Sequence, residues 1–121
     1  MRLLPKYGNV YKNDQYKQAD ARLLKRVKYI FGSLDSASKY HFLRGCDFLN
    51  RGDLKTAMFR FNQAWLMNPK NPDVFRGFGY VYTRLGEHAI ALKLYNEGLA
   101  IDPKNEDLLL EKTFATKELQ K

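Results

Sequence analysis

The sequence has few of the residues on which enzymes and metal proteins depend. In 121 residues it contains one cysteine, Cys46, and two histidines, His41 and His88. A single thiol excludes an internal disulfide and a cysteine-based zinc site within this chain. His88 stands beside Glu87, where a solvated surface histidine is common, and no converging set of polar residues accompanies either histidine. We therefore expect no catalytic residue, no bound metal and no cofactor.

Long apolar runs are also missing. No stretch approaches the ~20 apolar residues that a membrane-spanning helix requires, and no basic start with an apolar run and cleavage site marks a secretory leader. The composition, 45% hydrophobic and 28% charged, favours one folded domain over disorder. The sequence thus predicts a soluble chain, either cytoplasmic or, if a leader was removed, in a bacterial envelope or periplasm.

The positive charge of the chain is concentrated at its N-terminus. The whole chain carries a net charge of +8. Residues 1–32 hold eight Lys and Arg against two Asp, whereas residues 33–121 hold thirteen against eleven acidic residues. The basic excess therefore describes the N-terminal segment and not the rest of the chain.

Two short phrases, "NPKNPD" at residues 68–73 and "DPKNED" at residues 102–107, nearly repeat each other. The shift that carries the first onto the second also pairs small, aromatic and proline residues throughout: Gly45 with Gly79, Phe48 with Tyr82, Gly52 with Gly86, Ala57 with Ala91, Phe61 with Tyr95, Ala64 with Gly98 and Pro69 with Pro103. Within each unit, apolar and small residues recur at three-and-four spacing and a glycine interrupts halfway, which predicts two helices. Asp53, Asn71 and Asn105 are the expected N-terminal caps of helices.

A 34-residue helix–turn–helix period with this residue pattern resembles the tetratricopeptide repeat. The second unit carries the pattern on its first helix with Phe75, Phe78, Gly79 and Tyr82, and then with Ala91, Tyr95 and Pro103. The first unit departs from it at His41 and Arg44, where the family has large apolar residues. We therefore expect the first helix of that unit to be rotated toward Tyr40 and Leu43.

The predicted fold class is all-α: a helix–turn–helix repeat array, or α-solenoid, with two full repeats, an N-terminal packing helix and a C-terminal capping helix. The expected boundaries are an extended arm at 1–13, a basic amphipathic helix at 14–32, repeats at 36–69 and 71–103, and a capping helix at 105–120. The apolar stripe of the basic helix should pack on the open end of the first repeat, and its expected members are Tyr16, Ala19, Leu23, Val27 and Ile30.

The resemblance implies a non-enzymatic scaffold or adaptor that holds a partner's peptide or helix in a concave groove lined by the first helix of each repeat. Carried over by register, the groove residues are Phe42, Cys46, Leu49, Asn50, Arg76, Tyr80, Thr83, Leu110 and Phe114. The branch of the family that grips the C-terminal carboxylate of heat-shock chaperones has Lys and Asn where this chain has Phe42 and Cys46, so no carboxylate clamp is expected.

The groove residues predict a particular kind of ligand. We expect an apolar or aromatic anchor in a pocket of Phe42, Tyr80, Leu110 and Phe114, with Arg76 orienting the ligand or pairing with one of its acidic residues. In the other interpretation, the N-terminal arm of the same chain fills the groove.

A second class of function stays open because of the basic N-terminal helix. Such a helix can lie on an anionic membrane or on nucleic-acid phosphates, and binding of that kind weakens steeply with salt. The arm and this helix also resemble the region before the repeats in some bacterial envelope lipoproteins. The partner, the compartment and the oligomeric state, including a small homo-oligomer, are not fixed by the sequence.

Overall fold

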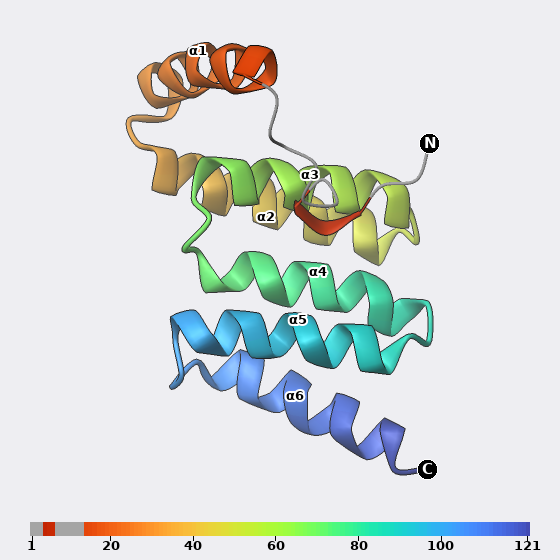
Figure 1. Cartoon of the computed structure of the whole chain (residues 1–121). Helices are drawn as coiled ribbons and strands as arrows, with labels where there is room; N and C mark the ends of the chain where they lie inside the picture. The colour runs from red at the N-terminus through yellow and green to blue at the C-terminus, as the bar shows by residue number, and fades with distance from the viewer. Residues whose placement is uncertain (1–3, 7–13) are drawn as a thin grey trace.

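The computed structural model describes residues 4–6 and 14–121, with side chains described for residues 4–6 and 21–121. Within this part of the chain the regular structure is helical and contains no strand (Figure 1). The helices are α1 (Asp14–Phe31), α2 (Leu34–Asn50), α3 (Leu54–Met67), α4 (Pro72–Arg84), α5 (His88–Ile101) and α6 (Glu106–Leu119). The predicted all-α helical repeat array is confirmed. No helix in the described ranges is long and apolar enough to cross a membrane.

The helix ends follow from side chains that satisfy free backbone N–H groups. Asp53 accepts a hydrogen bond from the backbone N–H of Thr56 at 3.1 Å, and Asn105 accepts one from that of Leu108 at 3.1 Å. Asn71 caps α4 in the same way, with Pro72 at the first helical position. The three predicted caps are therefore confirmed.

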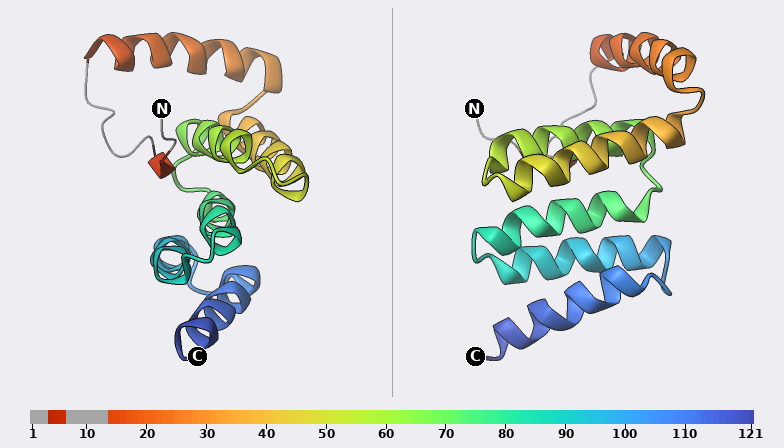
Figure 2. Two further views of the ribbon diagram at one scale, coloured as in Figure 1. Left: turned by 90° about the vertical axis from the view of Figure 1, so that its right-hand side faces the viewer. Right: turned by 180° about the vertical axis from the view of Figure 1, so that it is seen from behind.

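The helices stack in order, each packing on the next one along the chain (Figures 1 and 2). In addition, α4 contacts both α2 and α6. The first helices of the successive pairs therefore form one face, which we call the α2–α4–α6 face. The second helices form the α3–α5 face, which lies on the other side of the stack in the left view of Figure 2.

Glycines set the close approach of helices within the stack. Phe61 of α3 is fully buried, and a Cβ added at Gly45 or at Gly77 would lie 2.6 Å from its Cδ1 atom. Tyr95 of α5 is equally buried and faces Gly79 in the same manner. Because Gly45 and Phe61 recur as Gly79 and Tyr95 in the next unit, the sequence repeat corresponds to a repeated packing contact.

The expected rotation of α2 is wrong. His41 is buried, with its ring 5.3 Å from that of Tyr40 and its Nδ1 3.3 Å from an Arg60 nitrogen. Burial lowers the pKa of His41, and the nearby Arg60 charge lowers it further. Tyr40 and Leu43, toward which the rotation was expected, are 45% and 62% exposed. The close contact between Gly45 and Phe61 holds α2 in the regular register, so His41 is buried in place of a large apolar residue.

The buried stripe of α1 also differs from the expected one. Val27 is buried together with Ala37 and Met67, as predicted, but Leu23 is 38% and Ile30 66% exposed. The partly buried neighbours of Val27 on its own helix are instead Leu24 and Phe31. Val27 thus belongs to two overlapping apolar stripes of α1, the expected one with Leu23 and Ile30 and a second one with Leu24 and Phe31. The second stripe is the one that packs on the first repeat. The expected members Tyr16 and Ala19 lie outside the described side chains.

Candidate functional site

An arginine lies at the centre of the α2–α4–α6 face. The guanidinium carbon of Arg76 is 5.1 Å from the centre of the Phe42 ring and 5.9 Å from that of Tyr80. One terminal nitrogen lies 2.8 Å from Asp107 on α6, and the other lies 3.3 Å from Asp73. We call these five residues the Arg76 cluster. Both terminal nitrogens have carboxylate partners, whereas the buried Nε atom has none among the described residues. That Arg76 pairs with an acidic residue of a ligand stays a prediction.

Glu111 adds a third carboxylate to this region. Burial raises the pKa of Glu111, the charge of Arg76 opposes that rise, and Asp107 adds to it. The hydroxyl of Tyr80 is close enough to Glu111 to lower the pKa of that carboxyl slightly. Burial raises the pKa of Tyr80 to about 12, so this hydroxyl stays protonated at neutral pH. Asp73 and Asp107 pair with the guanidinium, and Glu111 lies near enough for its pKa to respond to that charge, so acidic residues outnumber the one arginine here.

Cys46 and Thr83, two other predicted groove residues, are half-buried on the same face. Burial raises the pKa of the Cys46 thiol, so it stays protonated at neutral pH and has little nucleophilic character. The hydroxyl of Thr83 lies 2.9 Å from that of Tyr95. Both side chains thus fit a packing role beside the Arg76 cluster.

The remaining predicted residues are more exposed. Phe114 is 45% exposed, and its ring stacks edge-on against His88 at 5.9 Å. Leu110 is 68% exposed, and Asn50 is exposed at the end of α2. The structure therefore brings Phe42, Arg76 and Tyr80 together, whereas Phe114 belongs to a neighbouring contact with His88.

Sequence reasoning missed the acidic members of the site. Asp73 and Asp107 hold the same position in the first turns of α4 and α6, and Glu111 follows Asp107 by one helical turn. Acidic residues in a first helical turn are equally expected from the helix dipole, so their type alone does not indicate a pairing. The sequence did contain one indication of the site: Asp73 and Asp107 recur at the repeat spacing, on the face that carries Arg76.

The three described residues of the N-terminal arm lie away from this site. The backbone carbonyl of Leu4 accepts a hydrogen bond from Asn62 of α3, and Lys6 pairs with Glu97 of α5. Residues 4–6 therefore sit on the α3–α5 face and not on the predicted groove. The rest of the predicted arm, 1–3 and 7–13, lies outside the described residues.

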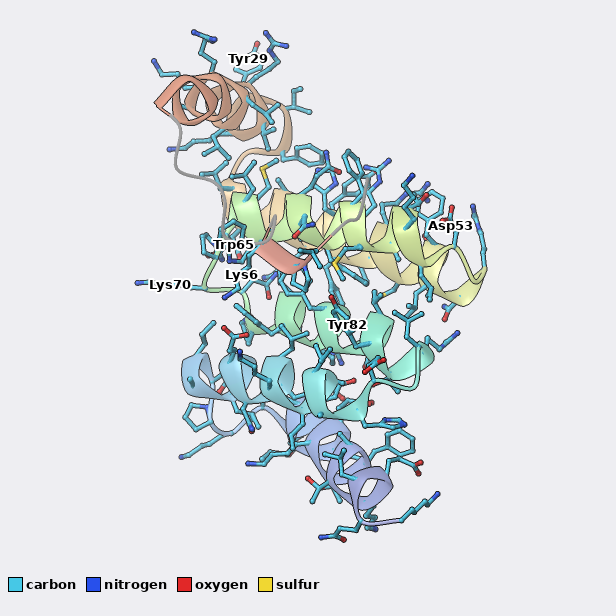
Figure 3. The ribbon with its side chains drawn as sticks, turned by 45° about the vertical axis from the view of Figure 1, so that its right-hand side comes forward. Lys6, Tyr29, Asp53, Trp65, Lys70 and Tyr82 are labelled. Atoms are coloured by element: carbon cyan, nitrogen blue, oxygen red, sulfur yellow. The ribbon has the colours of Figure 1, made fainter. Side chains whose placement is uncertain are left out.

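The basic residues of α1 face solvent. Arg22, Lys25, Arg26 and Lys28 are exposed, and the side chain of Lys17 lies outside the described part. Tyr29 is 90% exposed and points away from the repeats (Figure 3). Across the described side chains, no group of three or more His, Cys, Asp or Glu is placed to hold a metal ion.

Comparison with known proteins agrees with this architecture. The sequence model of the tetratricopeptide repeat matches residues 48–112, which is more than half of the chain. The protein named "Protein CTR9 homolog" from Arabidopsis thaliana is 30% identical over 57 residues, which cover 47% of this chain and 5% of that protein. The chain thus spans a small part of the length of this relative. Because the repeat model matches more than half of the chain and the helices stack in pairs, the chain belongs to the tetratricopeptide repeat family.

Proposed function

We propose that the chain is a non-enzymatic interaction module that binds a partner peptide or helix on its α2–α4–α6 face, without a carboxylate clamp. Tetratricopeptide repeats are generally non-catalytic and bind protein partners. The observation that carries the finer proposal is the Arg76 cluster, because it defines which ligand chemistry this face accepts and which it repels.

The cluster is a poor receptor for a carboxylate. Phe42 is only 6% exposed and Cys46 is an uncharged thiol, so neither offers a charge-assisted hydrogen bond. Asp73 and Asp107 already pair with the two terminal nitrogens of Arg76, and Glu111 adds further negative charge. An acidic ligand would be repelled, whereas a neutral or basic one would not.

Exposed apolar side chains supply the anchor for such a ligand. Leu110 and Phe114 follow Asp107 on α6 by about one and two helical turns and are 68% and 45% exposed. Large apolar side chains of this kind, next to a polar and charged cluster, resemble the anchors that carry most of the energy in protein interfaces. The ligand we infer is therefore a segment with an aromatic or aliphatic anchor and no acidic terminus at the cluster.

The experiment selects peptides from a displayed library on the purified chain and measures their affinity by fluorescence anisotropy. Phe114→Ala should weaken a selected peptide by roughly tenfold or more, as expected for an interface anchor. Tyr80→Ala should also weaken it while the helical circular dichroism stays intact. Phe59→Ala is the matched control, because Phe59 is also 45% exposed but lies on α3.

An acidic C-terminal chaperone peptide should bind weakly or not at all. Tight binding of that peptide, abolished by amidating its terminus, would overturn the proposal. Equal losses in Phe59→Ala and Phe114→Ala would place the ligand elsewhere on the chain.

A second candidate function uses the basic surface of α1. Four basic side chains are exposed there, together with Tyr29 and with Ile30, which is 66% exposed. This combination fits an anionic membrane or nucleic-acid phosphates. Lys25→Glu with Arg26→Glu should abolish salt-sensitive binding to phosphatidylserine vesicles or to single-stranded nucleic acid. If the parent chain binds neither probe at low salt, this alternative is excluded.

A further inference from the structure

The chain's own N-terminal segment occupies a surface on the α3–α5 face. Residues 4–6 run beside α3 (Figure 1), and two of them make polar contacts with different helices. The Nδ2 atom of Asn62 donates to the carbonyl oxygen of Leu4 at 2.8 Å. The ammonium of Lys6, which is labelled in Figure 3, lies 2.9 Å from a Glu97 carboxylate oxygen on α5 and 5.8 Å from the centre of the Phe75 ring on α4. Three consecutive residues thus connect three helices.

These contacts form a two-point recognition site. Asn62 is fully buried with residues 4–6 in place, and its amide donates to the Leu4 carbonyl. The Asn62 amide binds a backbone carbonyl, which every residue offers. Glu97 binds a cation on the residue two positions later in the bound segment. The side chains of Lys6 and Glu97 are 21% and 36% exposed, so the ion pair is partly shielded from water. The site therefore selects a basic residue at a fixed distance from an accepting carbonyl.

The arm fits this surface at a conformational cost. Lys6 has a backbone φ of +53°, in the left-handed region that residues with a Cβ rarely adopt. That strain opposes binding of the arm, while its covalent connection supplies an effective concentration in the millimolar range. A separate segment with the same groups and a relaxed backbone gains the contacts without the strain. Such a segment can compete with the arm.

The surface continues beyond the three residues that cover part of it. Glu97 also lies on an open face of α5, together with Ala89, Leu92, Lys93, Asn96 and Ala100. Asn96 holds the same position in the second repeat that Asn62 holds in the first. A ligand longer than three residues has room to extend from Glu97 along α5.

We propose that the α3–α5 face is a second peptide-binding site, filled in the free chain by residues 4–6. The partner is a protein segment with Lys or Arg two positions after a residue whose backbone carbonyl accepts a hydrogen bond, the spacing of Leu4 and Lys6. Binding of that segment displaces the arm. The site goes beyond the proposed function because it lies on the other side of the stack from the Arg76 cluster.

The test uses a fluorescent peptide with the sequence of residues 1–8, MRLLPKYG, titrated into the full chain. The parent chain should bind it weakly because its own arm competes. Lys6→Glu places two carboxylates together and releases the arm, so peptide affinity should rise at least about tenfold. Adding Glu97→Gln to Lys6→Glu should reverse that gain. Glu87→Gln, an exposed acidic residue at the start of α5, is the matched control and should leave the gain intact.

Three results would overturn the proposal. The first is equal peptide affinity in Lys6→Glu with and without Glu97→Gln, measured on variants whose circular dichroism matches that of the parent. The second is no binding to Lys6→Glu at about 1 mM peptide, where a site filled by a tethered segment should respond. The third is parent affinity equal to that of Lys6→Glu, which would mean that the arm does not compete. Phe114→Ala should not change any of these affinities, so failure here is distinct from failure of the α2–α4–α6 proposal.

Discussion

Replacement of Gly79 by alanine tests the packing that defines the repeat. A Cβ at this position would lie 2.6 Å from Cζ and 2.7 Å from Cδ1 of Tyr95, well inside van der Waals contact. Tyr95 is fully buried, and its hydroxyl is 2.9 Å from that of Thr83. The ring therefore cannot move away from α4 without disturbing its own packing or losing this hydrogen bond. We expect Gly79→Ala to destabilise the fold.

The size of the effect follows from opposing contributions. Alanine is favoured over glycine in a helix interior by about 1 kcal/mol. An extra methyl group in a packed core costs about 1–3 kcal/mol, and loss of the Tyr95 hydrogen bond costs about 1 kcal/mol more. The clash and the lost bond outweigh the helix propensity, which leaves a net loss of roughly 1–3 kcal/mol. At about 4 °C per kcal/mol for a domain near this size, the melting temperature should fall by roughly 4–12 °C.

Thermal unfolding followed by circular dichroism measures this change. The same substitution in a Tyr95→Leu background is the control, because the smaller side chain leaves room for the methyl group. There, Gly79→Ala should be neutral or stabilising, and the difference between the two backgrounds gives the coupling between the two positions. A Gly79→Ala variant that melts at or above the parent temperature would refute the packing argument.

The fold could be predicted to the extent that its contacts repeat. Gly79 and Tyr95 recur as Gly45 and Phe61 at the repeat spacing, because each pair lets two helices approach at the same place in a unit. The N-terminal helix has no second copy with which its pattern can be compared. Its two stripes share Val27, and only the contact with Ala37 and Met67 decides between them. The burial of His41 follows from the regular register that the contact between Gly45 and Phe61 imposes on α2, which the residue type at position 41 did not indicate.

The sequence predicted which face of the stack carries the candidate site, but not which of its residues form ion pairs with each other. The register placed Phe42, Arg76 and Tyr80 on one face, and the structure brings them into contact. It could not show that Arg76 is already paired, because Asp73 and Asp107 are equally typical of a helix N-terminus. That a partner binds there stays a prediction. The proposed site around residues 4–6 was beyond sequence reasoning, because Asn62 and Glu97 belong to no motif and lie on different helices, each in contact with one of these residues.

Three further predictions concern the helix contacts, the N-terminal segment and Glu111. Ala57→Leu and Ala91→Leu should each destabilise by about 1–3 kcal/mol in urea unfolding, because both alanines are fully buried; parent-like midpoints would show that these positions are not close contacts. Deleting residues 1–32 should lower the melting temperature, since it uncovers Ala37 and Met67 and removes the Lys6–Glu97 pair; an unchanged melt would mean that the segment adds no stability. Glu111→Gln should stabilise the fold near neutral pH. Burial raises the pKa of Glu111, so the folded state holds this proton more tightly than the unfolded state. The resulting stability is present below the unfolded pKa and is lost as the pH rises through the folded pKa. Glutamine stays uncharged, so the variant should melt above the parent at about pH 7.5, and the difference should shrink toward about pH 4. A difference that does not change with pH would show that Glu111 does not titrate as its burial requires.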